Sequence, residues 1–238
     1  VTDMSNAFQN RTNFDENIIG WDASNVTNMA RVFKNAISFN QPIGDWNTSS
    51  VTVMAETFYG ASSFNQTTGN WDTSSVSNMD SMFQGASAFN QNLNAWDVSN
   101  VSNVEGMFYG ASTFNQPIGD WNTSSATVMA NMFYGATNFD QNLSAWNVSN
   151  VTSMTAMFRG ASAFNQPIGD WNVSAVTSMA EMFRSATTFN QDIGDWSTSA
   201  VTNMSGMLHE TPSLSNANKG EIHKAFSTNQ NWPYPNWS

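Results

Sequence analysis

Residues 96–120 read WDVSNVSNVEGMFYGASTFNQPIGD, and Trp121 begins the same pattern again. The interval of 25 residues holds along the chain, with Trp at positions 21, 46, 71, 96, 121, 146, 171 and 196. Two Phe columns keep the same interval, at 8, 33, 58, 83, 108, 133, 158 and 183 and at 14, 39, 64, 89, 114, 139, 164 and 189. A fixed period of this length predicts a solenoid, in which each repeat forms one coil that buries its apolar residues against the next.

Composition and charge limit what the chain can do. Only 11% of the 238 residues are charged, and 7 basic against 18 acidic residues give a net charge of −11. An acidic chain repels phosphate backbones, so we expect no nucleic-acid partner. Cysteine is absent, which excludes disulfides and thiolate zinc sites. No apolar run approaches the ~20 residues of a membrane span, so we expect no membrane insertion.

Within each repeat the pattern predicts one short helix and one short strand. Met29, Val32, Phe33 and Ala36 fall on one face of a helix, with Thr27 as its N-cap. Gly at 60, 85, 110, 135 and 160 stands where that helix must end, in the left-handed conformation. Residues 40–44 and their equivalents are predicted as the strand. One parallel strand and one helix in each of about eight repeats would make an α/β solenoid.

The repeat columns stop after Leu208. We therefore assign residues 1–208 to the repeat solenoid and 209–238 to a C-terminal cap of the same domain. Residues 215–226 are predicted as a helix whose apolar side chains are Ile222, Ala225 and Phe226. A solenoid needs such a lid because its open end exposes unpaired edges and apolar surface. The chain starts mid-pattern at Val1, which indicates a piece of a longer chain, and we expect this piece to be monomeric.

The run V-T-x-M-x-x-M-F-x-G-A-x-x-F-N-Q resembles the BspA-like surface repeats, which also occur in mycoplasma surface lipoproteins and marine bacterial surface proteins. That family is a divergent branch of the leucine-rich repeats, and the resemblance covers essentially residues 1–208. The ending L-x-x-x-N-K-G-x-I-H-x-x-F resembles its C-terminal closure. The resemblance implies a right-handed leucine-rich-repeat-like solenoid, extracellular or cell-surface display, and adhesion or recognition. It implies no catalytic residues, and no nucleophile or metal motif points to an enzyme.

Binding residues are expected in columns that packing leaves free to vary. The most diverse column, called here the Tyr/Arg row, holds Lys34, Tyr59, Gln84, Tyr109, Tyr134, Arg159 and Arg184. Tyr and Arg are enriched at protein interfaces. The candidate binding residues are therefore Lys34, Tyr59, Tyr109, Tyr134, Arg159 and Arg184. A second variable row runs from Asn17 to Asp192, and drift on a solvated face is the competing explanation of both.

Acidic and aromatic columns offer further candidates. Asp45, Asp120, Asp170 and Asp195 share one register, and Asp170 and Asp195 of neighbouring coils are the calcium candidates. Calcium takes six to eight oxygens, so a solvated acidic edge is the favoured interpretation, and no other cofactor is expected. The Trp column is predicted to be core, which leaves Trp232 and Trp237 as the better sugar-stacking candidates.

Two polar columns are interpreted structurally. The Asn column that includes Asn40 and Asn65 is predicted to form a hydrogen-bonded ladder between coils. The Thr and Val column that includes Thr48 and Val98 could form an ice-binding array, but the exchange of Thr for Val favours a half-buried position.

Three function classes remain open after these arguments. The first is a surface module that recognises a protein or glycan on another cell or matrix. The second is a passive stalk or spacer in a larger surface protein, and the third is a calcium- or ice-binding repeat.

Overall fold

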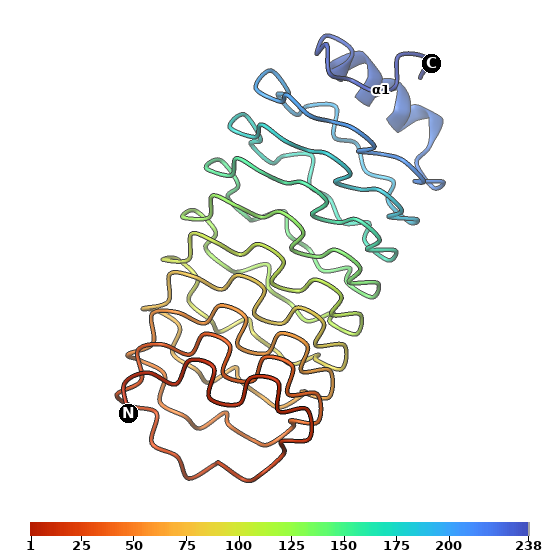
Figure 1. Cartoon of the computed structure of the whole chain (residues 1–238). Helices are drawn as coiled ribbons and strands as arrows, with labels where there is room; N and C mark the ends of the chain where they lie inside the picture. The colour runs from red at the N-terminus through yellow and green to blue at the C-terminus, as the bar shows by residue number, and fades with distance from the viewer. Residues whose placement is uncertain (238) are drawn as a thin grey trace.

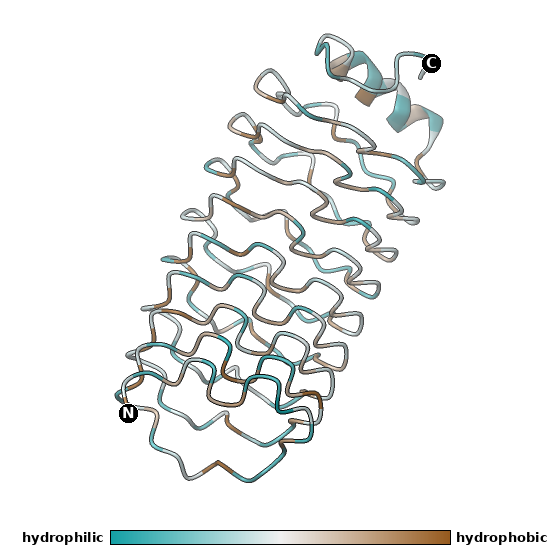
Figure 2. Ribbon diagram, viewed as in Figure 1, coloured by the Kyte–Doolittle hydropathy of each residue, from teal (hydrophilic) through white to brown (hydrophobic). Residues whose placement is uncertain are grey.

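The computed structural model describes residues 1–237 and is a stack of coils that follows the 25-residue period (Figure 1). Eight isolated parallel bridges, from Asp3↔Asn28 to Ser178↔Asn203, link nine successive coils. The N-terminus lies at one end of the stack, and helix α1 (Asn216–Phe226) covers the other. Hydrophobic and hydrophilic residues alternate along each coil, as Figure 2 shows.

The prediction of a right-handed α/β, leucine-rich-repeat-like solenoid with one strand and one helix per repeat is wrong. Within residues 1–237, α1 is the only helix, and it belongs to the cap rather than to a repeat. β-Bridge geometry is limited to one residue in each coil, so residues 1–237 form no extended strand or sheet, although other backbone hydrogen bonds also join the coils. The rest of each coil consists of turns and irregular backbone.

The segment predicted to be helical, residues 29–36, forms a series of turns, and every second N–H group is left to join the coils. The backbone N–H groups of residues 29, 31, 33 and 35 donate to carbonyls of the next coil at 2.6–3.0 Å. Arg31 and Asn35 have φ of 60° and 58°, a conformation that a right-handed helix excludes. Thr27 caps no helix, because its hydroxyl and N–H both donate to the Thr2 carbonyl of the preceding coil.

The segment predicted as a strand, residues 40–44, is held by side chains. The Asn40 N–H donates to the Asp15 carboxylate at 2.8 Å, and the Asn65 N–H donates to Asn40 Oδ1 at 2.9 Å. The same bond recurs in each following coil as far as Ser215. The predicted Asn ladder is therefore confirmed. It takes the place of a strand ladder, to which Pro42 could donate no N–H.

Aromatic columns fill the core. The Trp side chains from Trp46 to Trp196 are 2–4% exposed, which confirms that this column is core, whereas Trp21 in the first coil is 49% exposed. From Trp71 onward each indole N–H donates to a carbonyl of the preceding coil at 2.8–3.1 Å. The equivalent atom of Trp46 is buried and has no partner among the described residues. The column therefore contributes both packing and hydrogen bonds.

Glycine is required where two coils approach closely. A Cβ on Gly44 would lie 2.7 Å from the Thr67 carbonyl oxygen, and one on Gly119 would lie 2.6 Å from that of Asn142. Gly20 has no atom within 4 Å of such a Cβ. Gly44 and Gly119 share one register of the repeat, whereas Gly20 lies one position further along the coil, so the close approach is a property of particular sites.

The cap satisfies groups that the last coil leaves unpaired. The helix predicted at residues 215–226 is present as α1, and the N-cap Ser215 hydroxyl accepts the Asn218 N–H at 3.2 Å. The Tyr234 hydroxyl accepts the Leu208 N–H at 3.0 Å, in place of the carbonyl that a further coil would supply.

Candidate functional site

The Tyr/Arg row lies on the side of the stack where the coils are hydrogen-bonded by their backbones. Its seven side chains are half-buried, one in each successive coil. Equivalent rings are 4.3 Å apart at Tyr109 and Tyr134, 5.4–5.7 Å apart in the first Phe column, and 6.2–6.5 Å apart in the Trp column. Because this spacing widens from the row towards the Trp column, the row lies on the concave face. Solenoids use such faces for binding.

Neighbouring members of the row contact one another. Lys34 Nζ lies over the Tyr59 ring, 4.5 Å from its centroid, and Gln84 Nε2 donates to the Tyr59 hydroxyl at 3.4 Å. The rings of Tyr109 and Tyr134 are stacked with an interplanar angle of 7°. The Arg159 guanidinium lies 5.1 Å from the Tyr134 centroid. The six candidate residues are thus brought together in two groups along one line.

Two glutamates that the sequence analysis did not single out hold the ends of the row. Glu56 forms ion pairs with Arg31, at 2.8 Å, and with Lys34. Burial raises the pKa of Glu56, but hydrogen bonds from Lys34 and Arg31 outweigh burial and leave it lowered. The sequence already contained an indication of this pair, because Glu56 follows Lys34 by 22 residues, which is close to one repeat and places the two side chains in adjacent coils.

At the other end, Glu181 pairs with Arg184, at 2.7 Å, and with Arg159. The hydrogen bond from Arg184 is the main cause that lowers the pKa of Glu181. Glu181 also follows Arg159 by 22 residues, so the same spacing marks both ends. Each glutamate therefore bridges two basic residues, so the four basic residues here, counting Arg31 beside the row, all have an ion-pair partner.

The middle of the row is hollow. A cavity of about 370 Å³ lies between Gln84 and Tyr109, lined by Asp80, Ser81, Gln84, Glu105, Gly106, Tyr109 and Asn131. Burial raises the pKa of Asp80, although a hydrogen bond from Ser81 opposes the shift. Burial is also the main cause that raises the pKa of Tyr109, with its neighbour Tyr134 adding to it. This cavity is called the acidic hollow below.

The calcium candidates are placed apart from other ligands. Asp170 and Asp195 are both exposed. Nowhere in residues 1–237 do three His, Asp or Glu side chains gather as a metal ion would need. The register offers one carboxylate per coil in those two coils, as the sequence indicated.

Most of the sugar and ice candidates are buried, and Trp237 is half-buried. Trp232 is 8% exposed, packs edge-on against Phe226, and donates its indole N–H to His223 Nδ1 at 3.1 Å. Trp237 stacks on Tyr234 at 4.5 Å. The Thr and Val column predicted to be half-buried is fully buried, and Thr48 donates its hydroxyl to a backbone carbonyl at 2.9 Å. None of these columns presents an open array.

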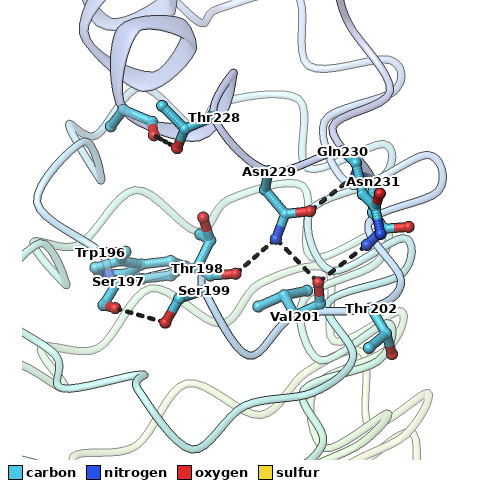
Figure 3. Close-up of a pocket in the computed structure, with 11 residues that line it drawn as sticks. Trp196, Ser197, Thr198, Ser199, Val201, Thr202, Thr228, Asn229, Gln230 and Asn231 are labelled. Atoms are coloured by element: carbon cyan, nitrogen blue, oxygen red, sulfur yellow. Dashed lines mark hydrogen bonds between the residues drawn. The ribbon is translucent and has the colours of Figure 1, made fainter.

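A larger hollow of about 610 Å³ lies where the cap meets the last complete coil (Figure 3). Asn229 reaches across it and donates to the carbonyls of Thr198, at 2.6 Å, and Val201, at 2.9 Å. Trp196 lines the hollow but is only 3% exposed, so its ring offers no free face to a sugar. The hollow is the space that a further coil would fill.

No helix among the described residues has the length and apolarity that a membrane crossing requires.

Comparison with known proteins places the chain in a family. A search of curated proteins finds no match. A family model described as "Mycoplasma protein of unknown function, DUF285" matches residues 1–71, 44–143 and 117–221. These overlapping matches extend across nearly all of the repeats, and the chain therefore belongs to the DUF285 family.

Proposed function

We propose that the chain is a non-catalytic recognition module, displayed outside the cell or on its surface, that binds a protein or glycan partner through the Tyr/Arg row. The observation that carries this proposal is the row itself. Its side chains differ from coil to coil, yet they contact one another along the concave face. Contacts of this kind hold side chains in place before binding, which lowers the entropy lost when a partner docks.

The chemistry of the row supports recognition rather than catalysis. Tyr and Arg are the residues that dominate interface energies, whereas the row contains no nucleophile next to a general base. The two histidines lie elsewhere, His209 beside Glu210 and His223 bonded to Trp232. Surface display is supported by the resemblance of the repeat to the BspA-like surface repeats.

Replacing Tyr59, Tyr109 and Tyr134 together with Ser tests the proposal. The triple variant should lose binding to whole cells or to immobilised glycoproteins, because a few aromatic anchors carry most interface energy. The matched control replaces the same three residues with Phe, which keeps the rings and their stacking. Circular dichroism should show that both variants are folded, since none of the three side chains belongs to the buried columns.

Other outcomes would favour the competing functions. If the Ser variant binds like the parent, and shortening the array by two repeats changes only reach, the chain is a spacer. If a calcium chelator abolishes binding while the Ser variant binds normally, the site is the register of Asp170 and Asp195.

A further inference from the structure

The acidic hollow interrupts an otherwise continuous row. Contacts run from Lys34 to Gln84 on one side and from Tyr109 to Arg184 on the other. The hollow lies next to Gly106, which has no side chain at a register where the neighbouring coils carry Ser81 and Asn131. A Cβ on Gly106 would lie 3.2 Å from Ser81 Oγ and 3.5 Å from Gln84 Oε1, so the backbone is already close to the walls.

The carboxylates of the hollow have no cation. Asp80 and Glu105 occupy one register in adjacent coils, where most other coils carry Ala. The Asp80 side chain accepts a hydrogen bond from Ser81 at 3.0 Å. The basic residues on this face pair with Glu56 or Glu181, and neither Asp80 nor Glu105 has an ion-pair partner among the described residues. Neither carboxylate is therefore held in an ion pair, although the charges of Arg31 and Lys34 oppose the rise in the pKa of Asp80 that burial causes.

The chain itself shows what such a site accepts. Lys34 lies over the Tyr59 ring and pairs with Glu56. Arg159 lies over the Tyr134 ring and pairs with Glu181. In both places one cation contacts an aromatic ring and a carboxylate at once, an arrangement that combines cation–π attraction with charge-assisted hydrogen bonding.

The hollow repeats this arrangement without its cation. Tyr109 lines it, and because one face of that ring is stacked on Tyr134, its other face is turned towards the preceding coil, which carries Gln84. Asp80 and Glu105 supply the carboxylates. A metal ion fits poorly, since calcium needs six to eight oxygens and no third acidic or histidine side chain joins these two.

We propose that the acidic hollow binds a Lys or Arg side chain from a basic segment of a protein partner. This inference rests on the proposed function and makes it more specific, because it selects a protein over a neutral or acidic glycan. The partner's cation would complete the row between Gln84 and Tyr109. The net charge of −11 would attract a basic segment to the chain, and the two carboxylates would hold its cation in the hollow.

The test uses Nα-acetyl-lysine methylamide as the probe, followed by NMR at the Gly106 amide and the Tyr109 ring. We expect saturable shifts of both signals with millimolar affinity, and no saturable shift with the isosteric norleucine analogue. The double variant Asp80→Asn, Glu105→Gln should bind the probe at least ~10-fold more weakly, because it removes the charges that hold the ammonium group. Unsaturable shifts, or equal binding by the double variant, would overturn the proposal.

A second pair of variants separates filling of the hollow from damage to the fold. Gly106→Asn should block the probe, because Asn fills the space and Asn131 already adopts φ of 58° at the same register. Gly206→Asn makes the same change outside the hollow, where φ is 63°, and should leave binding intact. Equal binding by both variants, or the same shifts produced by calcium chloride while the lysine probe has no effect, would refute a side-chain site.

The cell-binding assay distinguishes this inference from the proposed function. If the Tyr→Ser variant loses the partner and the Asp80→Asn, Glu105→Gln variant keeps it, recognition by the row stands and the hollow is not its cation site. If both variants bind the partner like the parent, both proposals are wrong.

Discussion

Replacing Trp121 with Ala in a central coil should destabilise the whole stack. The side chain is 4% exposed, stacks on Trp146 at 6.2 Å, and donates its N–H to the Leu93 carbonyl at 3.0 Å. A large-to-small change in a core costs ~3–5 kcal/mol. The Leu93 carbonyl also loses its donor, which adds ~1 kcal/mol or more. At ~2–4 °C per kcal/mol for a chain of this size, the total of ~4–6 kcal/mol should lower Tm by roughly 8–24 °C.

The chain offers a matched control for the hydrogen bond. Trp46 is also 4% exposed, but its indole N–H has no partner among the described residues. Trp121→Phe removes both ring volume and a hydrogen bond, whereas Trp46→Phe removes ring volume alone. Urea unfolding followed by circular dichroism should therefore show Trp121→Phe to be the costlier change by ~1 kcal/mol. Equal costs would refute the assigned hydrogen bond, and a Tm shift of one or two degrees for Trp121→Ala would refute the packed Trp column.

Three further measurements test the scaffold. Gly119→Ala places a Cβ 2.6 Å from a backbone carbonyl of the next coil and should cost ~1–3 kcal/mol in urea unfolding, whereas Gly20→Ala should be neutral; equal effects would contradict the close approach. Deleting residues 209–238 removes the acceptor of the Leu208 N–H and should cause end-to-end association in light scattering, unless the tail is only a linker. The hydrogen bond from Arg184 lowers the pKa of Glu181, and this stabilises the fold above pH 4.5 by less than ~1 kcal/mol, because solvent screens an ion pair at the surface. The contribution is lost as pH falls through the folded-state pKa. Glu181→Gln should therefore flatten the acid side of the Tm profile, and an unchanged profile would contradict the ion pair.

The period and the core could be predicted from the sequence, but the backbone of each coil could not. The spacing of Met29, Val32, Phe33 and Ala36 is typical of a helix, and all four side chains are buried as that spacing requires. A series of turns meets the same requirement when Arg31 adopts φ of 60°. At this register only the Gly residues at 106 and 206 and the Asn residues at 6 and 131 indicate positive φ, because the other coils carry residues that rarely adopt it.

The strand prediction failed for a related reason. The composition of residues 40–44 favours an extended backbone, but it does not show whether the hydrogen bonds between coils are made by backbone or by side-chain groups. Here the Asn side chain accepts the N–H of the next coil, which does the work of a ladder without a strand. The Asn column was identified correctly because a polar group repeated beside core positions must find a partner.

The candidate row was found by its variability, but its charge pattern was missed. Reading one column at a time separates Lys34 from Glu56, although adjacent coils bring the two side chains together. Considering each repeat separately also misses Asp80 and Glu105, because each resembles an isolated acidic surface residue in its own repeat. In a stack of coils, the chemistry of a site is found by comparing each residue with positions about one period away.

The different constraints on the columns of a coil explain why variable side chains collect in this row. Buried columns accept few residues, since Phe33 and its equivalents must stack at 5.4–5.7 Å and the Asn column must bond at every step. The row's backbone N–H and carbonyl groups are occupied within and between coils, but the scaffold asks little of the side chains. Tyr, Gln, Lys and Arg therefore all occur there without loss of the fold. If the row binds a partner as proposed, a change of partner would need only new side chains along the concave face, and the acidic hollow is the place where contacts between neighbouring coils of the row are interrupted.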